Sequence, residues 1–118
     1  MIPQSAATVF RVSNIEAALK QYQEVFGFAE VFRFGDYAGL KRGEMSLHLT
    51  GSSLYDKPVG GAAVYVFCDE VDGYFADLKK KGVCVKSEPR NHPYGMRDFV
   101  VADLDGNLLS FGCESKPA

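Results

Sequence analysis

The sequence predicts an α+β fold in which two tandem β-α-β-β-β modules form a concave mixed sheet, and three observations support this expectation. One helix-like apolar pattern recurs 56 positions later in the chain. Each copy is preceded by one strand-like run and followed by three. A stretch rich in glycine and serine, residues 51–61, separates the two sets. We therefore expect a single domain over residues 1–118, with a first module over about 1–56 and a second over about 57–118.

The first module begins with a strand over residues 7–12, where apolar and β-branched residues dominate. A helix follows, with Ser13 as its N-cap, Glu16 completing a capping box and Gly27 at its end. Its apolar residues fall at i, i+3, i+4 and i+7, which places them on one face. These residues are Ile15, Ala18, Leu19 and Tyr22.

Three short strands complete the first module, over residues 29–34, 37–42 and 45–50. Tight turns at Gly35-Asp36 and Gly43-Glu44 join them, because glycine reverses the chain at low steric cost. The three strands are expected to form a meander.

The second module repeats this order, with a strand over residues 62–68 and a helix capped by Asp69 and ended by Gly82. A strand over 83–88 and a loop over 89–95 follow. The apolar face of this helix is expected to consist of Val71, Tyr74, Phe75 and Leu78.

A hairpin ends the module, with strands in RDFVVAD (97–103) and NLLSFG (107–112). Asp105-Gly106-Asn107 is predicted to supply the positive φ angles of its turn.

Composition and charge exclude several classes of function. The net charge of −2 and the pI near 5.6 give no basic surface for nucleic acid. No apolar run approaches the roughly 18 residues that would span a bilayer, and the N-terminus lacks the pattern of a signal peptide, so we expect a cytosolic protein. The three cysteines are widely spaced, which favours buried reduced thiols: Cys68, Cys84 and Cys113.

Residues 93–112 also carry a resemblance to a known family. The order P-[WY]-G, then Arg and Phe, then D-x-x-G-N and a short apolar strand is similar to the end of the glyoxalase, bleomycin-resistance and extradiol dioxygenase superfamily, also called the vicinal oxygen chelate proteins. The resemblance implies two modules that enclose a cavity. It also implies a C2 homodimer, which in some members exchanges strands.

Members of this family that catalyse reactions hold a divalent metal on His and Glu side chains. The resemblance carries those four ligand positions to Ala7, His48, Ala63 and Ser110. Three of them lack a metal-binding side chain, and one imidazole is insufficient to hold a catalytic metal. His92 is expected in a loop away from this set. We therefore predict no metal, no cofactor and no catalytic residue, and His48 as a packed or groove-lining residue, although another ligand arrangement remains open.

Aromatic residues are predicted to line the cavity instead. If Ala63 points inward, Tyr65 and Phe67 do too, because strand side chains alternate. The bleomycin-binding branch, which this chain resembles, carries two inward aromatics in the same strand. That likeness places further aromatic ligand-binding residues near the groove, for which a position in the core is the open alternative: Phe32, Tyr37 and Tyr94. The polar residues expected to line the groove are His48, Ser110 and Arg11.

The leading hypothesis is a metal-free binding protein that sequesters a planar or cationic small molecule, with bleomycin-like antibiotics as the named candidate. Such a role needs affinity and no catalysis, so antibiotic resistance without enzymatic activity is favoured. The alternative is a metal-dependent lyase, isomerase or dioxygenase with an atypical ligand set that includes His48. A third hypothesis is a protein-interaction module that uses the groove for a peptide.

Overall fold

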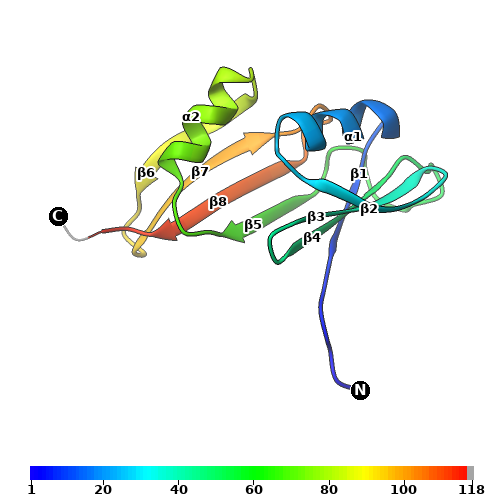
Figure 1. The fold of residues 1–118 in the computed structure, drawn as a ribbon, viewed down its shortest axis with the longest axis horizontal. Coiled ribbons are helices and arrows are strands. Elements are labelled where there is room, and N and C mark those ends of the chain that lie inside the picture. The colour runs from blue at the N-terminus through cyan, green and yellow to red at the C-terminus, as the bar shows by residue number, and fades with distance from the viewer. Residues whose placement is uncertain (117–118) are drawn as a thin grey trace.

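The computed structural model describes residues 1–116 and contains two four-stranded mixed sheets, each with one helix packed on it (Figure 1). The first module consists of β1 (Thr8–Arg11), α1 (Ile15–Glu24), β2 (Ala29–Phe34), β3 (Tyr37–Arg42) and β4 (Met45–Thr50). The second consists of β5 (Ala63–Phe67), α2 (Asp72–Lys80), β6 (Cys84–Asn91), β7 (Met96–Ala102) and β8 (Leu108–Glu114). The predicted tandem β-α-β-β-β order is therefore confirmed.

Both sheets have the same topology. The strand orders are β1-β4-β3-β2 and β5-β8-β7-β6, so the first strand of each module pairs with the last. That pairing is parallel, with Val9 opposite His48 and Tyr65 opposite Ser110, whereas the other strand pairs are antiparallel. Both helices lie on the same side of the sheets (Figure 1), which leaves the opposite sheet faces without a helix.

The cap of α1 differs by one residue from the prediction. Asn14, in place of Ser13, is the N-cap, and its Oδ1 accepts a hydrogen bond of 2.9 Å from the Ala17 amide. Glu16 then occupies the second helical position, one residue too early to reach back to the cap amide. Its carboxylate instead pairs with Arg33 on β2.

The cap of α2 differs as well. Asp69 does not cap this helix; the carboxylate of Glu70 accepts hydrogen bonds from the amides of Gly73 (2.8 Å) and Tyr74 (3.1 Å). These amides belong to the first turn, where backbone donors have no partner inside the helix. The acidic side chain also complements the positive end of the helix dipole.

Strand β6 is longer than predicted and includes Pro89, which the sequence places in a loop. It is one of the two outer strands of its sheet, and its pairing with β7 is irregular between Ser87 and Arg90. Proline is tolerated there because no ladder hydrogen bond requires its missing N–H. The outer strand of the first sheet, β2, has a similar irregularity between Glu30 and Phe32.

The prediction that the three cysteines are buried is wrong. All three are free thiols, but Cys84 is exposed and only Cys68 and Cys113 are half-buried. Cys84 opens the outer strand β6, where alternate side chains face solvent. Within residues 1–116, no helix is long and apolar enough to cross a membrane.

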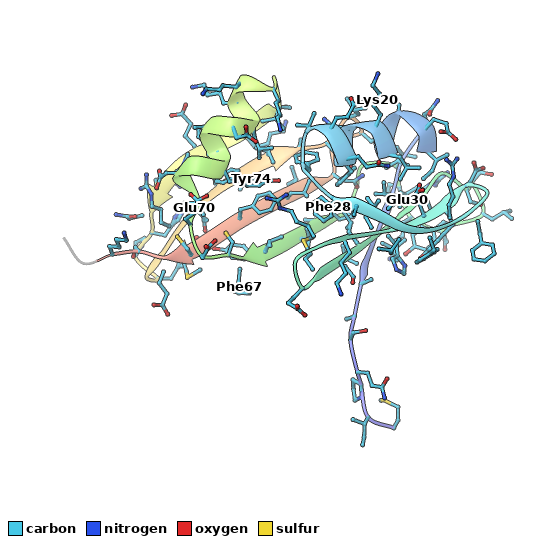
Figure 2. All side chains as sticks on the ribbon, viewed as in Figure 1. Lys20, Phe28, Glu30, Phe67, Glu70 and Tyr74 are labelled. Carbon is cyan, nitrogen blue, oxygen red and sulfur yellow. The ribbon has the colours of Figure 1, made fainter. Side chains whose placement is uncertain are left out.

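One hydrophobic core joins the modules. The predicted apolar face of α1 is buried. The centroids of the Tyr22 and Phe26 rings lie 5.0 Å apart. In the second module Phe99 and Phe111 stack at 5.4 Å. The Tyr74 hydroxyl donates a hydrogen bond of 2.7 Å to the Phe26 carbonyl, linking α2 to the end of α1. Figure 2 shows Tyr74 between α2 and the first module.

The turn between β7 and β8 supplies a second link. Gly106 has the positive φ (96°) that the sequence predicts, but Asn107 does not. Asn107 is instead fully buried, and its side-chain nitrogen donates to the Arg11 carbonyl (3.1 Å) and to Asp103 (3.0 Å). Its side-chain oxygen accepts from the Ala62 amide at 3.1 Å. One amide group therefore connects β1, the start of β5 and the final hairpin.

Asp103 extends this network into α1. Its carboxylate accepts a hydrogen bond of 2.8 Å from the buried hydroxyl of Tyr22 and one of 2.9 Å from the Asn107 amide. Burial, and then the nearby Asp103 charge, raise the pKa of Tyr22, so the hydroxyl remains a donor. We refer to Tyr22, Asp103 and Asn107 as the Asn107 network.

Replacing Asn107 by alanine should destabilise the fold by about 2–4 kcal/mol, because the change leaves the Ala62 amide without its partner and removes one of the two donors to the Arg11 carbonyl, the other being the Gly60 amide. Urea unfolding followed by circular dichroism measures the effect. Asn91→Ala, at an exposed position on β6, is the matched control and should change stability by less than about 0.5 kcal/mol. Equal stability of the two variants would contradict the role of the Asn107 network.

Candidate functional site

The sheet faces without a helix present the predicted aromatic residues. On β5, Val64 and Val66 pack against the core, whereas Ala63, Tyr65 and Phe67 alternate with them and are exposed. Tyr65 is 38% exposed and Phe67 79%. Figure 2 shows Phe67 pointing away from the helices. A polar and aromatic surface thus lies on the side opposite α2.

Tyr65 belongs to a cluster around Asp98, a residue on β7 that is only 5% exposed. The Asp98 carboxylate accepts hydrogen bonds from Tyr65 (2.9 Å) and Tyr94 (2.6 Å), and it contacts His92 Nε2 at 2.6 Å. The His92 and Tyr94 rings stack, with centroids 4.8 Å apart and planes 7° from parallel. We call Tyr65, His92, Tyr94 and Asp98 the Asp98 cluster.

The electrostatics of the Asp98 cluster keep the acid charged. Burial alone would raise the pKa of Asp98, but the bonds from Tyr94, Tyr65 and His92 together hold it below its ordinary value. Burial and the bond to Asp98 raise the pKa of Tyr65, so its hydroxyl stays protonated and donates. Three donors already surround this carboxylate, and its main effect is to fix the orientation of the two tyrosine rings.

A glycine makes room for Tyr65. Gly112 on β8 lies beside Phe67 and Asp98 in the strand pairing. A Cβ atom at Gly112 would lie 2.0 Å from the Tyr65 hydroxyl. Only glycine therefore allows the Tyr65 side chain to cross β8 and reach Asp98 on β7.

The first sheet has an analogous arrangement. A Cβ atom at Gly39 on β3 would lie 2.0 Å from the Phe32 ring, so Phe32 lies across that strand. Phe32 stacks on Tyr37 with centroids 6.2 Å apart and meets the His48 ring edge-on at 5.2 Å. The Tyr37 hydroxyl lies 2.7 Å from His48 Nδ1. We call Phe32, Tyr37 and His48 the His48 cluster.

The two remaining predicted residues lie at the edges of these clusters. Ser110 on β8 is paired with Tyr65, and Arg11 on β1 donates a hydrogen bond of 2.6 Å to the Lys57 carbonyl. The structure thus divides the predicted site between two sheets. Within residues 1–116, no aromatic pair joins the His48 cluster to the Asp98 cluster.

Sequence reasoning missed Asp98 and His92 as members of a site. It placed His92 in a loop apart from the other candidates, whereas the structure brings its ring to Asp98. An available signal was the position of Asp98 itself, an acid inside the apolar run MRDFVVA. A charge in such a strand requires partners, and Tyr94 and Tyr65 supply them.

The donor set does not fit the metal site of the family's enzymes. Ala7, Ala63 and Ser110 stand at three of the four ligand positions, and the fourth, His48, has its Nδ1 close to the Tyr37 hydroxyl. Among the described residues, no group of three His, Cys, Asp or Glu side chains is placed to hold a metal ion. A metal would need ligands from outside this arrangement.

A cleft of about 800 Å³ lies between the β3–β4 turn and the start of α2. Arg42 crosses it, with its guanidinium 5.0 Å from the Tyr74 ring centroid. Burial raises the pKa of Tyr74 to about 12. Phe67 lines this cleft, but neither the His48 cluster nor the Asp98 cluster does. The cleft is therefore separate from most of the predicted site.

Comparison with solved structures shows the same fold in several bacterial proteins. TnmS3, an antibiotic binding protein from Streptomyces sp. CB03234, is 27% identical with a TM-score of 0.82, over 97% of this chain and 98% of its own. A lactoylglutathione lyase from Agrobacterium tumefaciens is 25% identical with a TM-score of 0.78, over 95% and 96%. A superfamily member from Sphaerobacter thermophilus DSM 20745 is 23% identical with a TM-score of 0.84, over 96% and 98%.

No curated protein sequence matches the chain. A family model does: the Glyoxalase/Bleomycin resistance protein/Dioxygenase superfamily model matches residues 4–111. This range includes both modules and both aromatic clusters. The chain belongs to the glyoxalase/bleomycin resistance protein/dioxygenase superfamily.

Proposed function

We propose that the protein is a metal-free small-molecule binding protein of the bleomycin-resistance type, which sequesters a planar or cationic ligand at a dimer interface. The observation that carries this proposal is the pair of aromatic clusters on the exposed sheet faces, one in each module. Bleomycin-like antibiotics are the candidate ligands, and resistance in the cytosol is the corresponding role.

Preorganised rings support binding. Tyr65 and Tyr94 are held by Asp98, and Tyr37 by His48, so little side-chain entropy is lost when a ligand arrives. Aromatic faces stack on planar rings and attract cations, with about 0.5–2 kcal/mol for each contact. Micromolar affinity corresponds to about 8 kcal/mol, so roughly four or five contacts at the upper end of this range are required, and none of them needs a catalytic group.

The similar proteins include both a binding protein and an enzyme. TnmS3 is described as an antibiotic binding protein, while the Agrobacterium tumefaciens relative is described as a lyase. The residues at the metal positions favour the former, because Ala7, Ala63 and Ser110 cannot supply the family's ligands.

A dimer would complete the groove. Each exposed sheet face carries only half of the predicted site, and several large apolar or aromatic side chains there remain exposed. They include Phe32, Phe34, Tyr65, Phe67 and Tyr94. We propose a C2 dimer that apposes these faces and encloses two ligand sites.

The alternative function is a metal-dependent lyase, isomerase or dioxygenase with an atypical ligand set. Two observations support this alternative: His48 lies on the exposed sheet face, and the chain is similar to a lyase. Metal analysis of protein purified without chelator separates the two, since a stoichiometric transition metal would support the enzyme.

Isothermal calorimetry with metal-free bleomycin should show a micromolar or tighter Kd with one ligand per chain. Tyr65→Ala and Phe67→Ala should each weaken binding about tenfold, because each removes a stacking surface. Leu104→Ala removes an apolar side chain from the β7–β8 turn whose exposure, 63%, lies between those of Tyr65 and Phe67, and it should leave the Kd unchanged. Absence of heat with bleomycin would remove it as a candidate, and equal losses in all three variants would argue against the aromatic groove.

Gly112→Ala should weaken ligand binding about as much as Tyr65→Ala, because the added methyl group displaces the Tyr65 ring from Asp98. Gly51→Ala is the control: its Cβ would meet only ordinary contacts, the nearest at 3.6 Å. Calorimetry on both variants, with thermal melts to confirm folding, provides the measurement. Unchanged affinity in Gly112→Ala would show that the position of Tyr65 does not matter.

Size-exclusion chromatography with light scattering should give twice the 12.9 kDa mass of one chain at micromolar concentration. Phe34→Asp places a charge on the exposed face of β2, where the side chain is 80% exposed, and should shift the protein toward monomer. Leu104→Asp, outside that face, should remain dimeric. A monomeric wild type would contradict the proposed assembly.

A further inference from the structure

A pocket of about 300 Å³ lies where the two modules meet, apart from the cleft at α2. Val9 and Arg11 of β1 form one wall, Ala63 of β5 another, and the loop from Tyr55 to Gly61 the third. Val9 is paired with His48, and Ala63 precedes Tyr65 on the same face of β5. The pocket therefore adjoins both aromatic clusters, and we call it the Arg11 pocket.

Arg11 lines this pocket, and its guanidinium is only partly used by hydrogen bonds within the chain. Its Nη1 donates to the Lys57 carbonyl at 2.6 Å, which fixes the side chain against the loop. Its Nε is covered by neighbouring atoms and has no hydrogen-bond partner among the described residues. A buried N–H group is costly to leave unsatisfied, so a ligand oxygen that displaced the atoms covering Nε would gain a strong bond.

Charge in the Arg11 pocket is one-sided. Arg11 and Lys57 both line it, and neither forms an ion pair within residues 1–116. Asp56 belongs to the same loop but does not line the pocket. The third polar side chain that lines the pocket is Tyr55. Burial, and then the nearby Tyr55, raise the pKa of Tyr37, so Tyr55 lies near the His48 cluster.

We propose that the Arg11 pocket binds a carboxylate of the ligand whose planar part stacks on the aromatic clusters. Guanidinium and carboxylate match in shape and charge, and the Nε of Arg11 has no hydrogen-bond partner among the described residues. Lys57 adds a second positive charge and Tyr55 a hydroxyl donor. This inference rests on the proposed function and, within its planar or cationic ligand class, selects planar molecules that carry a carboxylate over purely cationic ones.

The Asp98 cluster favours the same preference. Its carboxylate is already surrounded by Tyr65, Tyr94 and His92, so it offers little pairing capacity to a cationic ligand. The charged residues that line the Arg11 pocket are Arg11 and Lys57. The electrostatic selection therefore falls on an anionic group.

Three fluorescent probes with one ring system test the proposal: anthracene carboxylate, anthracene carboxamide and aminomethylanthracene. The wild-type protein should bind the carboxylate about tenfold more tightly than the carboxamide, with the amine weakest. Arg11→Gln should remove this preference, weakening the carboxylate about tenfold and the carboxamide less than about twofold. Lys57→Gln, which keeps the backbone carbonyl bonded to Arg11, should reduce the preference partially.

Lys86→Gln is the matched control, since Lys86 is exposed on β6, and it should bind all three probes as the wild type does. Thermal melts confirm that Arg11→Gln is folded. Equal affinity for the three probes, or an equal loss of all three in Arg11→Gln, overturns the carboxylate site while leaving the aromatic groove in place.

If no probe binds, the proposed groove itself fails, and a direct readout still decides the Arg11 pocket. The Nε–H resonance of Arg11, assigned by its loss in Arg11→Gln, should shift in heteronuclear NMR spectra when acetate is added. Chloride at the same ionic strength should not shift it. An unmoved resonance overturns the carboxylate site independently of the aromatic clusters.

Discussion

The buried amide of Asn107 is the interaction on which the rest of the arrangement depends. It joins the backbone of β1 to the backbone that enters β5, and through Asp103 it reaches the Tyr22 hydroxyl of α1. These partners come from both modules, and the Ala62 amide among them has no other hydrogen-bond partner among the described residues. The position of β1 beside β5 follows from this network, and with it the Arg11 pocket.

The two modules reach similar aromatic surfaces through the same device. A glycine in a strand, Gly39 or Gly112, leaves a flat area of backbone over which a ring from the neighbouring strand lies. Each ring then meets a polar partner, His48 in one module and Asp98 in the other. The glycine backbone thus sets the shape of each aromatic surface, and the hydrogen bonds and ring contacts with His48 or Asp98 fix the orientation of its rings.

Sequence patterns located the helices, strands and glycine ends well, because periodicity and turn chemistry are local. The face of α1 and the bounds of β2, β3 and β4 agree with the prediction. Contacts between distant residues could not be read in this way. Asn107 looked like a turn residue, and the link between His92 and Tyr65 exists only because both reach Asp98 across strands.

The irregular outer strands have a consequence for assembly. Sheets with regular, unpaired outer strands can add strands from other chains without limit and aggregate. Here β6 contains Pro89 and an irregular stretch, and β2 has its own irregularity near Phe32. Continuous backbone pairing with another molecule is disfavoured along both strands. Two of the four outer strands are thus protected, which lowers the risk of fibrous association for a protein that exposes large aromatic side chains on its sheet faces.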